Sequence, residues 1–333
     1  MNARAPVAKG EAFEVSILIA TYDRPLSLKK TLQSVLDQRN RLGLTVEIVV
    51  TDNHPSGSGA AAVEALQGGA FPIRYVTDLT RNMSILRNRG FAEARGRLAA
   101  LIDDDEVAAP DWLDELVAAL RETGADIAVG PRLADFAGGA PPAYDPTGAQ
   151  FMRDLHLPDR AEIVLTEASG KPRYGLGTGN SLFNLAACFP NGAEPMRPGF
   201  GDAGGEDAEM FARLHRDGRR LVWASKAFVT ETVTPNRTTI AYRLIRTRRE
   251  TQHYVAIYVD GARKPSQALA ILTAKGLIQL VAGILLFVTT GEFLSQNRIN
   301  GRLLIEHGLG KLLWRKSVGY IKEPTWEGQT GSV

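Results

Sequence analysis

A run of four acidic residues is the first feature of the 333-residue sequence that could do chemistry. Asp103, Asp104, Asp105 and Glu106 follow directly on a short apolar run. Adjacent carboxylates repel one another unless a cation offsets their charge. Carboxylate oxygens, together with substrate phosphates, are the ligands that Mg²⁺ and Mn²⁺ prefer. The run therefore indicates either a divalent-metal site or a solvated acidic turn before a helix that follows Pro110.

A second acidic pair stands at the start of a predicted helix. Glu206 and Asp207 come straight after Gly204 and Gly205, and apolar residues at helical spacing follow them. A carboxylate placed there can act as a general base if it points into a cleft. Acidic residues in the first turn also cap helices and interact favourably with the helix dipole. The pair alone is compatible with both interpretations.

Other side chains are of types that bind nucleotides. Arg87 lies in a stretch rich in Arg and Asn. A guanidinium group can donate two parallel hydrogen bonds to phosphate oxygens. Tyr22 could stack on a base, although an aromatic residue beside a strand also suits the core. Asp52 could accept a hydrogen bond from a base or ribose, or form an Asx turn with Asn53.

Short apolar runs predict the strands that would position these residues, and stretches with helical spacing separate them. The predicted strands are residues 15–20, 47–50, 72–76, 98–102 and 125–129. This alternation predicts an α/β fold with a largely parallel sheet, in which ligands bind at the carboxyl ends of the strands. Thr21–Arg24, Asp52 and Asp103–Asp105 all follow such ends. The Gly- and Pro-rich residues 134–150 predict a loop.

Composition excludes several classes of protein. Hydrophobic residues make up 44% and charged residues 23%, which is typical of a globular chain and excludes wholesale disorder. The single cysteine, Cys188, excludes an intrachain disulfide framework and a cysteine-based zinc site. The first 13 residues lack the apolar segment of a secretory signal, so none is expected, and we expect them to be disordered.

Charge is distributed unevenly along the chain. Residues 1–235 carry 25 Lys and Arg against 31 Asp and Glu, a net of −6, whereas residues 236–333 carry 14 against 6, a net of +8. A basic C-terminal third suggests an anionic partner such as a membrane, a lipid diphosphate or nucleic acid.

The C-terminal third also carries apolar segments. Residues 269–290 are apolar apart from Lys275 and Gln279, and residues 298–316 interleave leucines with basic residues. The second segment predicts a basic amphipathic helix on an anionic membrane surface. An ordinary helical pair docked on the body, or a helix that spans the bilayer, would give a similar pattern.

Five motifs in this order and spacing resemble the family 2 glycosyltransferases, which have the A-type nucleotide-sugar-binding fold. The likeness extends over residues 14–250. Within the family, the segments 82–88, 204–211 and 231–237 are most similar to bacterial succinoglycan-type exopolysaccharide glucosyltransferases. The five motifs lie at residues 15–25, 48–53, 87–88, 101–106 and 204–207.

The resemblance implies a role for each matching residue on the donor side. Asp105 would bind the divalent metal, Mn²⁺ or Mg²⁺. The relatives carry a His where this chain has Thr230, which leaves Asp105 as the one protein ligand that the resemblance implies. The residues implied to hold the nucleotide sugar are Thr21, Tyr22, Arg24, Asp52, Arg87, Asp103 and Asp104.

The resemblance also implies the catalytic and acceptor residues. Asp207 would be the catalytic base, with Glu206 beside it. Gly205, Arg243 and Arg246 are candidates for binding the acceptor. The chain lacks the Gln-x-x-Arg-Trp motif of processive synthases, so one sugar is expected per encounter.

The expected function is inverting transfer of one hexose, with glucose favoured, from a UDP-sugar to a lipid-diphosphate-linked oligosaccharide. The expected place is the cytoplasmic face of a bacterial inner membrane, with an anionic membrane surface and no specific nucleic acid as partner. A non-catalytic scaffold and a nucleotidyltransferase are the alternatives. The expected division is a donor half over residues 14–106, an acceptor half over 107–238 and a basic helical region over 239–333.

Overall fold

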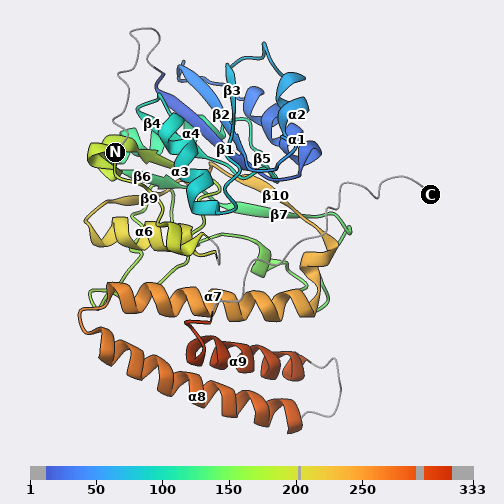
Figure 1. The fold of residues 1–333 in the computed structure, drawn as a ribbon, viewed down its shortest axis with the longest axis vertical. Helices are drawn as coiled ribbons and strands as arrows, with labels where there is room; N and C mark the ends of the chain where they lie inside the picture. The colour runs from blue at the N-terminus through green and yellow to red at the C-terminus, as the bar shows by residue number, and fades with distance from the viewer. Residues whose placement is uncertain (1–12, 202–203, 290–295, 317–333) are drawn as a thin grey trace, which may run out of the picture.

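A seven-stranded sheet forms the centre of the protein in a computed structural model that describes residues 13–201, 204–289 and 296–316 (Figure 1). The strand order is β3-β2-β1-β4-β8-β6-β9. Neighbouring strands are parallel except at β8, which is antiparallel to both β4 and β6. The strands are β1 (Val15–Thr21), β2 (Val46–Asp52), β3 (Ile73–Thr77), β4 (Leu98–Leu101), β6 (Ile127–Val129), β8 (Ser181–Asn184) and β9 (Leu221–Trp223).

Helices cover both faces of this sheet, and each face has its own apolar core. In β1, Ile17 and Ile19 pack into one core while Leu18 packs into the other, which is why this strand is a continuous apolar run. The first core takes α1 (Pro25–Leu36), α2 (Ala60–Glu64) and α4 (Trp112–Thr123). The second takes α3 (Met83–Glu93), α5 (Leu185–Cys188) and α6 (Glu206–Arg216).

A second, three-stranded sheet lies beside the carboxyl end of β4. Its order is β5 (Glu106–Ala108), β10 (Val229–Val233) and β7 (Arg132–Phe136). The prediction of a loop throughout residues 134–150 is wrong at its start, because β7 pairs in parallel with β10, which lies almost a hundred residues later. Short 3-10 helices lie at Ala149–Phe151, Pro190–Gly192, Pro198–Phe200 and Pro235–Thr238.

Three long helices follow the sheets. α7 (Ile240–Gly261) lies across the α/β body, and α8 (Pro265–Thr289) and α9 (Gln296–Leu312) lie on its far side (Figure 1). The apolar segment predicted at 269–290 falls in α8, apart from Thr290, which lies outside the described residues, as do residues 1–12 of the segment predicted to be disordered. The predicted boundaries at 106 and 238 stay predictions.

Glycines let α8 and α9 approach backbone to backbone. A Cβ atom on Gly283 would lie 2.7 Å from the Gly301 carbonyl oxygen, and one on Gly308 would lie 2.8 Å from the Gly276 carbonyl oxygen. Such close contact requires glycine at these positions. α9 is therefore docked between α7 and α8. This is the arrangement of the alternative interpretation, an ordinary helical pair docked on the body, whereas the membrane contact predicted for residues 298–316 stays a prediction.

α8 leaves most of its apolar surface uncovered. Among the described helices it is the one long and apolar enough to cross a membrane, and only 17% of its most apolar window is buried. Soluble proteins rarely expose a continuous apolar face of this kind. α8, rather than α9, is thus the candidate for contact with a membrane. Its exposed large side chains are Ile271, Leu277, Ile278, Val281, Ile284, Leu285 and Val288.

Candidate active site

One cleft of about 1850 Å³ collects most of the residues that the sequence singled out. The carboxyl ends of β1 and β4 form one wall, and the start of α6 lies opposite. The 175–179 loop and one face of α7 also line it. Ligand sites in α/β sheets lie at such strand ends.

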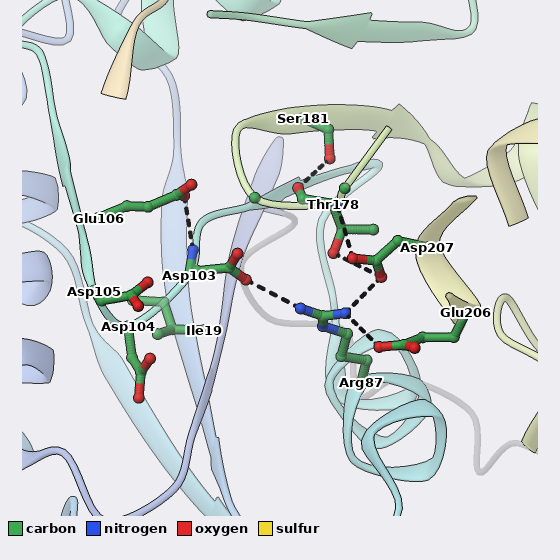
Figure 2. A network of polar contacts seen from close by, with 12 residues as sticks. Ile19, Arg87, Asp103, Asp104, Asp105, Glu106, Thr178, Ser181, Glu206 and Asp207 are labelled. Atoms are coloured by element: carbon green, nitrogen blue, oxygen red, sulfur yellow. Dashed lines mark hydrogen bonds and ion pairs between the residues drawn. The ribbon is translucent and has the colours of Figure 1, made fainter. Parts of the chain in front are cut away.

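Arg87 joins the two acidic clusters at the centre of the cleft. Its Nη2 donates to Asp103 Oδ1 at 3.1 Å, and its Nη1 donates to Glu206 Oε1 at 3.0 Å and to an oxygen of Asp207 (Figure 2). Arg87 comes from α3, Asp103 follows β4, and the two other carboxylates begin α6. Three motifs far apart in the sequence therefore meet at one guanidinium group.

A short loop fixes the second side of Asp207. The Thr178 N–H donates to Asp207 Oδ2 at 3.2 Å, and its hydroxyl donates to Oδ1 at 3.1 Å. Buried Arg153 holds this loop, because its guanidinium donates to the carbonyl oxygens of Gly177 and Gly179. Burial lowers the pKa of Arg153 to about 10. Thr178 and Arg153 were not among the residues predicted from the sequence, because only the folded chain brings them to α6.

Glu206 and Asp207 differ in their access to the cleft. The Glu206 side chain is 3% exposed, whereas that of Asp207 is 19% exposed. Burial, and then the charge of Asp207, raise the pKa of Glu206 to about 7, against the opposing effect of Arg87. Asp207 is thus the better placed of the two to contact a ligand, whereas buried Glu206 accepts a hydrogen bond from Arg87.

Asp104 and Asp105 face away from Arg87 (Figure 2). The Thr21 hydroxyl donates to Asp104 Oδ2 at 2.7 Å, and Arg24 Nη1 donates to Asp104 at 3.1 Å and to Asp105 at 3.0 Å. Burial raises the pKa of Asp104. The structure therefore brings Thr21 and Arg24, from the end of β1 and the residues after it, to the acidic run after β4.

A further arginine and glutamate lie beside Asp105. Arg237 Nη1 is 3.5 Å from Asp105 Oδ2 and 2.6 Å from Glu231 Oε1, and Arg132 Nε is 2.9 Å from Glu231 Oε2. Burial, and then the charge of Glu231, raise the pKa of Asp105 to about 7. Glu231 and Arg237 stand in a segment that the resemblance included without giving them a role. Glu231 immediately follows Thr230, the position where the resemblance implies a His.

The carboxylate of Asp105 could serve as the one protein ligand of a divalent ion. Within residues 13–201, 204–289 and 296–316, no three His, Cys, Asp or Glu side chains are grouped closely enough to hold an ion by themselves. Asp105 lies at the cleft wall, and its raised pKa indicates a carboxylate that a cation would stabilise. Mg²⁺ and Mn²⁺ often take one or two carboxylates and fill the shell with substrate phosphates. These residues therefore fit such an ion at Asp105.

Asp52 is the predicted donor residue that lies apart from the rest. It is fully buried, and its carboxylate accepts hydrogen bonds from the Tyr75 hydroxyl at 2.6 Å and the backbone N–H groups of Gly59 and His54. The bond to His54 is that of an Asx turn. A contact between Asp52 and a base stays a prediction. Tyr22 is exposed at the cleft, with its ring edge-on to that of His54.

Two of the three residues predicted to bind the acceptor line the cleft. Gly205 and Arg246 line the cleft, whereas Arg243 lies outside the lining formed by the described residues. Gly205 has a φ of +90°, and a Cβ atom there would lie 2.6 Å from Cγ of His253. Only glycine therefore suits the start of α6. The role of all three residues in acceptor binding stays a prediction.

Comparison with known proteins defines the class. The model of glycosyl transferase family 2 matches residues 16–165, which include β1 apart from Val15, all of β4 and the acidic run. The chain is also 30% identical over 304 residues to the succinoglycan biosynthesis protein ExoM of Rhizobium meliloti, covering 90% of this chain and 92% of that protein. The chain therefore belongs to glycosyl transferase family 2, which confirms the resemblance seen in its sequence.

Solved structures share the fold. A mannosyltransferase of Pyrobaculum calidifontis in complex with GDP-Man and Mn²⁺ has a TM-score of 0.56 and 17% identity, covering 94% of this chain and 90% of that one. S. aureus TarS 1–349 in complex with UDP has a TM-score of 0.52 and 14% identity, covering 92% and 93%. These likenesses confirm the predicted A-type fold.

Proposed function

We propose that this enzyme transfers one hexose, with glucose favoured, from a UDP-sugar to a lipid-diphosphate-linked oligosaccharide, with inversion at the anomeric carbon. The observation that carries the proposal is the contact of Arg87 with both Asp103 and Asp207. This contact places the Asp207 carboxylate, which can accept a proton, next to the Arg87 guanidinium, which can bind a phosphate. Two relatives support the exopolysaccharide context, since ExoM and ExoO of Rhizobium meliloti are named for succinoglycan biosynthesis.

The proposed step uses Asp207 as general base. The acceptor hydroxyl gives its proton to an Asp207 oxygen while its own oxygen forms a bond to the anomeric carbon. The bond from that carbon to the diphosphate oxygen breaks, and UDP leaves with the electron pair. Attack opposite the leaving group inverts the configuration. Thr178 and Arg87 orient Asp207 for this step through their hydrogen bonds to its carboxylate.

The cationic groups of the cleft would oppose the charge that develops on the leaving diphosphate. Arg24 and Arg237 both contact Asp105, and Arg87 contacts Asp103, so all three lie on the donor side. Asp105 would hold a divalent ion, Mn²⁺ or Mg²⁺, which supplies further charge stabilisation when bound. Thr21, Tyr22, Asp52 and Asp104 would position the nucleotide and sugar, with Asp52 at the base. The hydrogen bonds of Asp52 to Gly59 and His54 would also fix the loop that follows β2.

We further propose that the exposed face of α8 holds the enzyme on an anionic membrane at the cytoplasmic side of a bacterial inner membrane. The apolar face supplies burial in the lipid, and the basic residues of the C-terminal third supply attraction to anionic headgroups. A lipid-linked acceptor would then be presented to an enzyme already at the surface.

Transfer of labelled sugar tests the proposal. The purified protein is incubated with radiolabelled UDP-glucose, or with other UDP-hexoses in parallel, Mn²⁺ and a lipid extract of an exopolysaccharide-producing bacterium. Label is expected in the organic phase, and NMR of the product is expected to show the anomeric configuration opposite to that of the donor. A product with the donor's configuration, or no transfer from any nucleotide sugar, would contradict the proposal.

A further inference from the structure

α7 has two faces with different partners. One face packs on α9, where Arg248 forms an ion pair with Glu306 and the Thr251 hydroxyl lies 2.8 Å from His307 Nδ1. Gln252 on this side donates to backbone carbonyls that follow α9. This face therefore joins the body to the C-terminal helices.

The other face of α7 lines the cleft. Its residues recur every three or four positions, so they form one stripe along the helix. Two arginines lie in the stripe. The acidic residue among them, Glu250, accepts a hydrogen bond from Arg246 Nε at 2.6 Å, which leaves the stripe with a net positive charge. Apart from Glu250, the stripe consists of Tyr242, Arg246, Arg249, His253, Tyr254 and Ile257.

The stripe reaches the catalytic carboxylates. The His253 ring packs against Gly205, the residue directly before Glu206 and Asp207. The donor-side carboxylates, Asp103 to Asp105, lie on the opposite side of Arg87 (Figure 2). An acceptor that attacks opposite the leaving diphosphate would approach Asp207 from the side away from that diphosphate. α7 lines the cleft beside Gly205, next to Asp207.

The cleft has room for a second ligand. Its volume of about 1850 Å³ exceeds the roughly 300–1000 Å³ of an ordinary ligand pocket. One guanidinium group can donate two parallel hydrogen bonds to phosphate oxygens. Tyrosine rings offer flat apolar surfaces with a polar edge. The stripe thus matches a ligand that carries both phosphate and sugar.

We propose that the cleft face of α7 is the subsite for the diphosphate of a prenyl-linked acceptor, bound by Arg246 and Arg249, with Tyr242 and Tyr254 packing on the attached sugar. The prenyl source is chosen because α8, the proposed membrane contact, packs on α9, which in turn packs on α7 (Figure 1). This inference rests on the proposed function and assigns its acceptor site.

The four arginines of α7 provide a matched set of variants. Arg249 faces the cleft, whereas Arg248, the next residue, contacts α9 through Glu306. Substituting either one by alanine removes the same charge from the same helix. Only Arg249→Ala removes it from the proposed subsite.

Calorimetric titration of farnesyl diphosphate tests the assignment. The full chain is first saturated with UDP and Mn²⁺, so that the donor site is filled, and inorganic pyrophosphate is titrated in parallel as the soluble source of the same group. Arg249→Ala is expected to weaken farnesyl diphosphate binding by roughly tenfold to a hundredfold, as expected for a lost charged hydrogen bond. Arg248→Ala is expected to change it less than threefold, and both variants should bind UDP like the unmodified chain.

Three outcomes would overturn the inference. These are unchanged farnesyl diphosphate binding in Arg249→Ala, equal losses in both variants, or pyrophosphate binding as tight as that of farnesyl diphosphate, which would assign a soluble ligand. Arg249→Gln replaces the alanine variant if that variant does not fold. Failure of the unmodified chain to bind UDP would contradict the proposed function instead, so the two failures are distinguishable.

Discussion

The cleft and the α8–α9 pair differ in what holds them together and in what they leave exposed. In the cleft, arginines and carboxylates from distant segments neutralise one another, as Arg87 does with Asp103 and Asp207. In the helical pair, glycine backbones make the closest contacts, as at Gly283 and Gly301, and apolar side chains remain outside. The apolar cores of the body are buried on both faces of its sheet, whereas α8 exposes the apolar face that we propose a membrane covers.

From this difference we propose that the cleft carries out the chemistry and that the α8–α9 pair holds the enzyme at a membrane. α7 belongs to both, because one of its faces lines the cleft and the other packs on α9. If the assignment is right, substitutions in the cleft should change catalysis and leave membrane binding alone. Substitutions on α8 should do the reverse.

The largest expected effect comes from Asp207→Asn. The amide cannot take the acceptor's proton, so we expect turnover to fall by roughly 10² to 10⁴. Arg87 keeps its bonds to Asp103 and Glu206, so the melting temperature and vesicle binding should change little. Turnover is measured by release of UDP. Asp217→Asn, at the exposed far end of α6, is the matched control, and a similar rate in both variants would place the base elsewhere.

A charge on α8 tests the other side of the comparison. Ile278 is 67% exposed on α8 and Leu79 is 63% exposed on the body, so glutamate at either one adds the same charge at similar exposure. Ile278→Glu should weaken binding to anionic vesicles about tenfold or more, because a charged group opposes burial in lipid. Leu79→Glu should not. Co-sedimentation with phosphatidylglycerol vesicles measures the effect, and equal binding by both variants would remove α8 from the membrane contact.

Thr178→Val tests how Asp207 is positioned. Valine keeps the shape and the backbone N–H but removes the hydroxyl that donates to Asp207 Oδ1. We expect kcat to fall about tenfold, in line with the loss of one charged hydrogen bond, while KM for the UDP-sugar stays the same. Thr178→Ser should restore most of the rate. A change in donor KM alone would make Thr178 a donor-binding residue.

The smallest expected effect is the pH dependence of stability at Glu206. Its pKa is raised to about 7 in the fold, so the protonated carboxyl is the form that the fold favours. Its contribution to stability is complete below about pH 4.5 and is lost as the pH rises through 7. Glu206→Gln resembles the protonated form. It should leave the melting temperature nearly unchanged at pH 5 and raise it by a few degrees at pH 8. A fall in the melting temperature at pH 8 instead would mean that Glu206 is ionised in the fold and stabilised by Arg87.

Several strands and the site residues that follow them could be predicted from the sequence, because their sequence patterns are local. The strands β1, β2 and β4 are buried on both faces, so they stand out as continuous apolar runs. Parallel strands end at the same edge, which is why Thr21, Arg24 and Asp103–Asp105 could be grouped before the structure was known. The glycines and acidic pair at 204–207 likewise marked the start of α6.

The rest depends on contacts between distant segments. The second sheet pairs β10 with β5 and β7, and no local pattern reveals that register. That pairing is what brings Glu231 and Arg237 to Asp105. The hydrogen bonds of Asp52 to Gly59 and Tyr75 likewise depend on the folded loop, and its predicted contact with a base stays a prediction. The arginines of α7 could be counted in the sequence, yet only packing shows which of them face the cleft.

The proposed donor site at Asp105 is tested most directly by a calorimetric titration of UDP into the unmodified chain and into Asp105→Ala. Each titration is done with Mn²⁺ and again after removal of divalent ions by EDTA. We expect UDP binding that strengthens with Mn²⁺ in the unmodified chain, and loss of that metal-dependent gain in Asp105→Ala. Absence of UDP binding under every condition, or the same Mn²⁺ effect in both proteins, would contradict the donor site described for this cleft.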